Sequence, residues 1–114
     1  MGTSIKSDDH LDYIMDKYEK PILIDFFMEK CNPCKKFMPE WNKLYEKMHS
    51  KVKMVKANRE NVPYYRQEFG VRSYPTVLLL LPNGEQHVYK GKREARKVYK
   101  WTKEIVMAYY RGCE

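Results

Sequence analysis

Apolar residues follow helical and strand periods in turn along the whole chain. The run Ile-Leu-Ile-Asp-Phe-Phe at 22–27 is almost continuously apolar, which predicts a strand buried on both faces, with the carboxylate of Asp25 in its middle. The apolar stripes of residues 7–19 and 34–49 repeat every three or four positions and predict a helix on either side of this strand. Periodicity and turn residues predict the remaining elements: strands near 3–6 and at 51–57, 76–81 and 86–89, and helices at 63–69 and 94–110.

The order of these elements predicts an α/β protein, because helices and strands alternate first and a hairpin and a last helix follow. A chain of 114 residues is long enough for one core, and we expect residues 1–114 to form a single domain. With 43% hydrophobic and 32% charged residues, the composition is that of an ordinary globular protein rather than a disordered one.

The chain carries a formal net charge of +7, which indicates a solvated basic surface or attraction to acidic proteins. No nucleic-acid-binding motif accompanies this charge, so nucleic acid is not an expected partner. No apolar run approaches the roughly 18 residues of a membrane span, and the first ten residues lack the apolar core of a signal peptide. We therefore expect a cytoplasmic protein, in a reducing compartment, with no membrane partner.

Cys31 and Cys34 stand two residues apart and allow three interpretations: a metal clip, a structural disulfide or a redox pair. A closed zinc site takes four ligands, and the other candidates form no second close pair, so no metal is expected; they are His10, His49, His87 and Cys113. Cys31 follows a buried strand and Cys34 opens a helix, whose N-terminus stabilises a thiolate. This context favours a redox pair, with Cys31 as the exposed attacking thiol and Cys34 as the shielded resolving thiol.

Around these cysteines the chain resembles the thioredoxin family. The resemblance is carried by ILIDFFMEKCNPCKKFMPEW and EFGVRSYPTVLLLLPNGE, and it runs over nearly the whole chain. It implies the thioredoxin fold, a central mixed sheet of four to five strands flanked by helices on both faces. The segments CKKFMPEWNKL and FGVRSYPT, together with the later YKGKR, are most similar to the catalytic domains of protein disulfide isomerases.

The resemblance also implies roles for individual residues. Pro75 corresponds to a cis-proline packed against the cysteine pair, where the backbone offers substrate a strand-like edge. Asp25 corresponds to a buried carboxylate, paired or protonated, that accepts the proton of Cys34, and Lys56 to the lysine that accompanies it. The implied catalytic set is therefore Cys31, Cys34, Asp25 and Lys56, and the substrate contacts are Lys30, Asn32, Pro33, Tyr74, Pro75 and Thr76.

Three residues around the cysteines depart from the family patterns. The family usually has Trp where Lys30 stands and Gly where Asn32 stands, so an apolar platform for substrate is missing and a positive charge lies beside Cys31. Disulfide isomerases carry His where Pro33 stands, and the absence of that His predicts a more reducing pair.

The expected function is that of a thiol–disulfide oxidoreductase which reduces or exchanges protein disulfides without a bound cofactor. Electrons would come from a separate reductase or from small thiols, which places the protein in electron transport and cell redox homeostasis. Two alternatives stay open: a disulfide isomerase or oxidase domain, and a binding module that uses the fold with a redox-sensing pair. We expect a monomer, although Cys113 leaves a disulfide-linked dimer open.

Overall fold

The structure is a computed structural model that describes residues 1–112, and it contains five strands and four α-helices. The strands are β1 (Thr3–Ile5), β2 (Ile22–Phe27), β3 (Lys53–Asn58), β4 (Thr76–Leu80) and β5 (Gln86–Val88). The helices are α1 (Asp8–Lys17), α2 (Asn32–Met48), α3 (Pro63–Glu68) and α4 (Ala95–Gly112), with a 3₁₀ turn, η1 (Arg59–Asn61), after β3.

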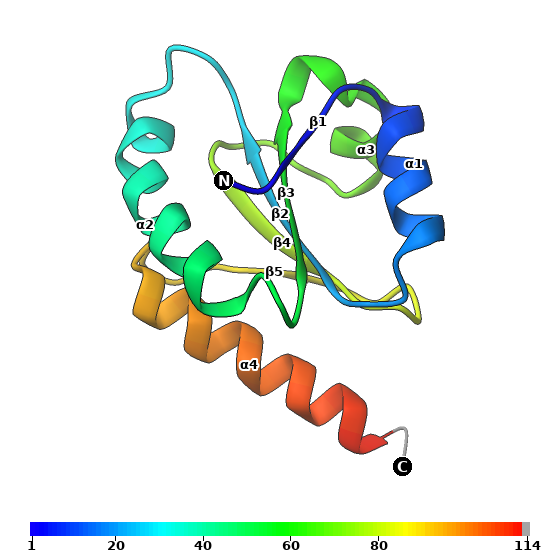
Figure 1. Ribbon diagram of the computed structural model, residues 1–114. Coiled ribbons are helices and arrows are strands. Elements are labelled where there is room, and N and C mark those ends of the chain that lie inside the picture. Colours follow the sequence, from blue (N-terminus) through cyan, green and yellow to red (C-terminus); the bar gives the residue numbers. More distant parts are fainter. Residues whose placement is uncertain (113–114) are drawn as a thin grey trace.

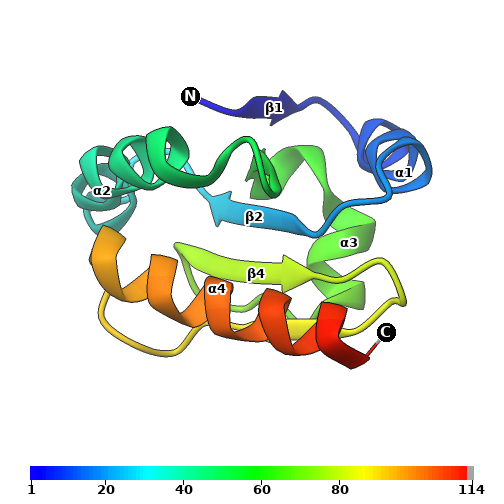
Figure 2. The same ribbon diagram turned by 60° about the horizontal axis from the view of Figure 1, so that its bottom comes forward.

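The strands form one mixed sheet in the order β1-β3-β2-β4-β5. β3 is parallel to β1 and β2, whereas β4 is antiparallel to β2 and β5. Figures 1 and 2 show α1 and α3 on one face of this sheet and α2 and α4 on the other. The α/β class and the thioredoxin-type arrangement expected from the sequence are confirmed.

The alternation of side chains along the central strand divides the core into two halves. Ile22, Ile24 and Phe26 of β2 pack with residues of α1 on one face. Leu23, the residue between the first two, packs with Phe37 and other residues of α2 on the opposite face. Asp25 has the same parity as Leu23, so the strand directs its carboxylate toward the layer formed by α2 and α4.

The helix ends are fixed by side chains from the loops and from neighbouring elements. The Ser7 hydroxyl accepts a hydrogen bond from the backbone N–H of His10 and caps α1. Asp8, the first residue of α1, accepts hydrogen bonds from the backbone N–H groups of Tyr64 and Tyr65 at the start of α3. One carboxylate therefore ties α1 to α3 across their shared face.

The third strand begins two residues later than the sequence predicts. The backbone N–H groups of Lys51 and Val52 both donate to the carbonyl of Met48, which extends the end of α2 into a turn. Because these donors are used, the parallel pairing with β2 starts at Lys53, opposite Ile22.

Three segments meet at one edge of the sheet. β2 and β3 are parallel and end in register, with Phe27 opposite Asn58, so the segments that follow them emerge side by side. The antiparallel strand β4 begins at this edge, with Thr76 opposite Phe26. The β2–α2 loop, η1 and the segment before β4 therefore gather where a site can form, at the top of Figure 1. None of the helices described over residues 1–112 combines the length and apolar character needed to cross a membrane.

Candidate active site

The two cysteines lie at the first turn of α2 and are joined by a disulfide, with their Cα atoms 5.2 Å apart. Cys31 is the residue that caps the helix: its Sγ accepts a hydrogen bond from the backbone N–H of Cys34 at 3.2 Å. Pro33 occupies the first turn, where a backbone N–H has no partner inside the helix. A thiolate at Cys31 would gain from that N–H and from the positive end of the helix dipole.

The two sulfur-bearing residues do not differ in exposure as the sequence predicted. Cys31 is 4% exposed and Cys34 is 7% exposed, so the expectation of an exposed outer and a shielded inner cysteine is wrong for this disulfide form. Cys31 is covered because its Sγ lies against the segment before β4, 3.8 Å from the carbonyl oxygen of Tyr74. What separates the two sulfurs is their environment: only Cys31 has its sulfur at the helix cap.

The segment before β4 has the geometry that the family resemblance implies. The Tyr74–Pro75 peptide bond is cis, and Pro75 is buried. The pairing of β5 with β4 begins at Leu78, so over the described residues the segment 74–76 has no strand partner on that side. Thr76 is held in place through its hydroxyl, which donates to the carbonyl of Ser73 at 2.6 Å.

Asp25 is a carboxylate in the core, only 4% exposed, and its Oδ1 has no hydrogen-bond partner among the described residues. Burial raises the pKa of Asp25 to about 7, because the ionised form loses its hydration. The positive charges of Lys56 and Arg93 act in the opposite direction and lower this pKa. The carboxyl is therefore poised to exchange a proton close to neutral pH.

Lys56 is the nearest neighbour of Asp25 across β2 and β3, since the two residues are in register. No ion pair between them occurs among the described residues, and the Lys56 ammonium lies 6.0 Å from the centroid of the Phe27 ring. Of the two expected forms of Asp25, the carboxylate in an ion pair is thus not observed. A pKa of about 7 fits the other form, a carboxyl group that carries a proton.

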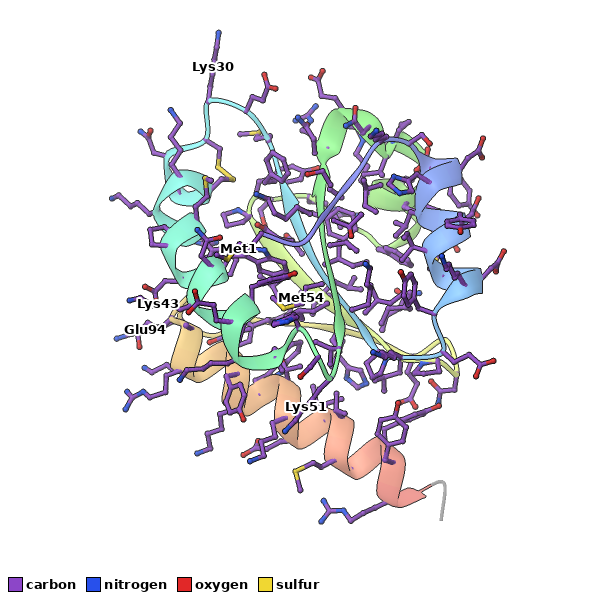
Figure 3. The ribbon with its side chains drawn as sticks, in the orientation of Figure 1. Met1, Lys30, Lys43, Lys51, Met54 and Glu94 are labelled. Atoms are coloured by element: carbon purple, nitrogen blue, oxygen red, sulfur yellow. A yellow bond between two sulfur atoms is a disulfide. The ribbon has the colours of Figure 1, made fainter. Side chains whose placement is uncertain are left out.

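The remaining expected contacts surround the disulfide on the surface. Asn32 and Pro33 are exposed on the first turn of α2. Lys30 is exposed in the loop before it and points into solvent, away from the body of the molecule (Figure 3). Its φ of 56° is in the left-handed region, which residues other than glycine seldom adopt.

Two arginines near the site were not recognised in the sequence. Arg93 follows the β5 strand and acts on Asp25 through its charge. The guanidinium carbon of Arg59, in η1, lies 5.8 Å from the ring centroid of Tyr74. Arg93 ends the segment YKGKR, which resembles disulfide isomerase domains, but that resemblance assigned it no role, and Arg59 belongs to no periodic pattern. The packing of loops against the sheet places both residues here. Cys113 lies outside the described residues.

Comparison with known proteins finds similarity to the family that the sequence resembles. The family model described as Thioredoxin matches residues 3–104. The thioredoxin of Rickettsia typhi is 34% identical over 87 residues, which cover 75% of this chain and 82% of that protein. A thioredoxin structure from Fasciola hepatica has a TM-score of 0.77 at 17% identity, over 90% of this chain and 97% of that one. The first thioredoxin domain of mouse protein disulfide-isomerase A4 has a TM-score of 0.78 at 22% identity, over 88% and 72%.

A helix-capping cysteine disulfide beside a cis-proline at the edge of a mixed sheet defines a dithiol–disulfide redox protein. The chain belongs to the thioredoxin family, as the family model and the Rickettsia relative show, and the two structural similarities add the fold alone. It is a protein-disulfide oxidoreductase that uses the Cys31–Cys34 pair.

Proposed function

We propose that this oxidoreductase works as a net reductant of protein disulfides, with Cys31 as the nucleophile. The observation that carries the proposal is the position of the Cys31 sulfur, which caps α2 and lies beside the Tyr74 carbonyl. A thiolate here is stabilised by the helix, and a substrate strand along the segment 74–76 would present its disulfide to it.

In the reduced protein the Cys31 thiolate attacks one sulfur of the substrate disulfide. The substrate S–S bond breaks, its second sulfur leaves as a thiolate, and a mixed disulfide forms between Cys31 and the first sulfur. Cys34 loses its proton and attacks the Sγ of Cys31, which closes the Cys31–Cys34 disulfide and releases the first substrate sulfur. The substrate gains two electrons, which the protein loses. Cys34 releases one proton, and the two substrate thiolates take up their protons from solvent.

Asp25 is the proposed acceptor for the proton of Cys34. Support comes from its side of the sheet, which faces the α2 layer, and from a pKa of about 7, which allows uptake and release near neutrality. Lys56 and Arg93 tune that pKa through their charges. Lys30, Asn32 and Pro33 would contact substrate from the α2 side, and Tyr74, Pro75 and Thr76 from the β4 side.

The partners that this function needs are disulfide-bearing proteins and an electron donor, either a separate reductase or a small thiol. We propose that the chain acts as a single domain and a monomer without a bound cofactor, because one sheet holds every element of the site. A reducing pair works where its surroundings keep it reduced, which favours the cytoplasm.

Reduction of insulin by dithiothreitol tests the proposal. The protein should accelerate insulin precipitation, the Cys31→Ser variant should not, and Cys113→Ser should behave like the parent. If the protein instead refolds scrambled ribonuclease and leaves insulin intact, it is an isomerase or oxidase. If it does neither and its disulfide form binds partners, it is a redox-sensing module.

A further inference from the structure

An open cleft of about 430 Å³ lies beside the segment that carries Pro75. Three arginines from three different elements line it: Arg59 of η1, Arg66 of α3 and Arg72 of the loop before β4. No acidic side chain lines this cleft. The positive charge of the three arginines is therefore not balanced by any residue that lines the cleft.

Another cleft of similar size, about 420 Å³, shows the contrast. It lies between α2 and the start of α4, near the position where Lys43 and Glu94 are labelled in Figure 3. Its basic residues are Lys43, Lys47 and Arg96, and they are balanced by Glu40, Glu46 and Glu94 in the same lining. The lining of that cleft contains as many acidic as basic side chains, whereas the lining of the arginine cleft contains basic ones alone.

The guanidinium groups of the arginine cleft have no ion-pair partner within residues 1–112. The Nε of Arg59 is buried and has no hydrogen-bond partner there. A buried donor without an acceptor lowers the stability of the free protein, and an incoming oxygen atom would remove that penalty. Arginine is the side chain best suited to hold a carboxylate, because its donors form a planar fork.

The cleft lies next to the reacting sulfur. Tyr74 belongs to its lining, and the carbonyl oxygen of Tyr74 is 3.8 Å from the Sγ of Cys31. Arg59 follows β3 directly at the sheet edge from which the loop to Cys31 also emerges. A chain that lies along the segment 74–76 with its sulfur at Cys31 has its flanking residues within reach of the arginines.

We propose that this cleft binds acidic side chains of the substrate protein that flank the disulfide to be reduced. The cleft then acts as a specificity site: Asp or Glu beside the substrate cysteine forms charge-assisted hydrogen bonds with Arg66 and Arg72, and with the Nε of Arg59. The proposal rests on the proposed function, because the segment 74–76 must be the edge along which substrate lies.

Three synthetic disulfide peptides of equal length test this assignment. They differ only at two positions beside one cysteine, which hold Glu-Glu, Gln-Gln or Lys-Lys. At low salt kcat/KM should be about fivefold higher for the Glu-Glu peptide than for the Gln-Gln peptide, and this ratio should fall in 0.5 M NaCl. The Lys-Lys peptide should have a lower kcat/KM than the Gln-Gln peptide. In Arg66→Gln/Arg72→Gln the Glu-Glu to Gln-Gln ratio should drop to about one.

The matched control is Arg96→Gln, which removes one charge from the balanced cleft, and its double variant with Lys47→Gln removes two. Both should keep the parental ratio. The proposal is overturned if the parental protein has a Glu-Glu to Gln-Gln ratio of one, or if the ratio is unchanged in Arg66→Gln/Arg72→Gln. It is also overturned if the control variants lower the ratio equally, because the preference would then reflect only long-range attraction to a basic protein.

A binding measurement separates this proposal from the redox function. The Nε–H signals of the arginines are followed by NMR while a Glu-Glu peptide with serine in place of both cysteines is added. Arg59, Arg66 and Arg72 should shift and Arg96 should not. Absence of these shifts overturns the proposal even if all peptides are reduced; shifts without reduction overturn the proposed function alone. Shifts with inorganic phosphate but not with the peptide would mean a site for a free anion and contradict the assignment.

Discussion

Asp25 and Lys56 lie side by side in the parallel pairing of β2 and β3, yet they form no ion pair. The carboxylate is buried without a partner for its Oδ1, and the ammonium lies over the ring of Phe27. A direct ion pair would hold the pKa of Asp25 low and keep it ionised. Because the two charges are separated, burial has the largest effect on Asp25 and raises its pKa to about 7.

This relationship predicts how stability depends on pH. The pKa of Asp25 is higher in the folded state, about 7, than the ordinary value of 3.8, so the folded protein binds more protons between these two values. Stability therefore falls as pH rises from about 4 to 7 and levels off above 7. The disulfide form of Asp25→Asn should gain little at pH 4 and up to about 4 kcal/mol at pH 8 in denaturant unfolding.

The control for this experiment is Asp16→Asn, because Asp16 is exposed on α1. It should show no gain that grows with pH. A gain for Asp25→Asn that is equal at pH 4 and pH 8 would mean that ionisation of Asp25 is not the cause.

The same carboxyl predicts a rate effect. With Asp25 as proton acceptor for Cys34, reduction of a substrate disulfide should accelerate as pH rises through about 7, where Asp25 ionises. Asp25→Asn should be slower by about tenfold or more at pH 7.5 and should lack this rise. A variant with the parental pH profile would show that Asp25 has no part in proton transfer. Stopped-flow fluorescence of single-turnover reduction gives the profile.

The position of Cys31 at the helix cap predicts which sulfur reacts first. Iodoacetamide at pH 7 should modify Cys31 of the reduced protein before Cys34, as mass spectrometry of the digested product can measure. The Cys113→Ser background removes the third thiol from the comparison. Cys34→Ser should accumulate a mixed disulfide with substrate through Cys31. Faster labelling of Cys34, or trapping by Cys31→Ser instead, would reverse the two roles.

The left-handed conformation of Lys30 predicts an unusual substitution pattern. Lys30→Val should be less stable than Lys30→Gly by roughly 1–2 kcal/mol, because a β-branched side chain clashes with the backbone at a φ of 56°. The matched pair at Lys36, exposed within α2, should show the opposite order, since glycine is the poorer helix former there. Thermal unfolding of the four variants measures both differences, and the same order at both positions would refute the explanation.

Much of the fold could be predicted because its signals are local. The continuous apolar run predicted β2 with both of its bounds correct, Ile22–Phe27, and the turn residues between the strands predicted at 76–81 and 86–89 placed the β4–β5 hairpin. The 3₁₀ turn at Arg59–Asn61 was missed, because three polar residues carry no periodicity. The late start of β3 was missed as well, since it depends on how the end of α2 uses its carbonyl at Met48.

Some residues of the candidate site could likewise be predicted from local sequence signals, whereas others depend on contacts between distant segments. Cys31, Cys34 and Pro75 could be found from motifs, whose spacing is visible in one sequence. The burial of Cys31 could not, because it depends on the approach of Tyr74 from 43 residues away. Arg93 and the arginines of the cleft are brought to the site by contacts between distant segments of the chain, which a single sequence does not reveal.

The reduction potential of the Cys31–Cys34 pair tests the central claim most directly. Pro33 in place of the His of disulfide isomerases favours a reducing pair, whereas the position of Cys31 at the helix cap favours the thiolate form. Equilibration with glutathione buffers of defined potential, followed by alkylation and mass analysis, should give roughly −210 to −270 mV, between the values of protein disulfide isomerase and thioredoxin. A value above about −160 mV would make the pair an oxidant and contradict the proposed role as a net reductant.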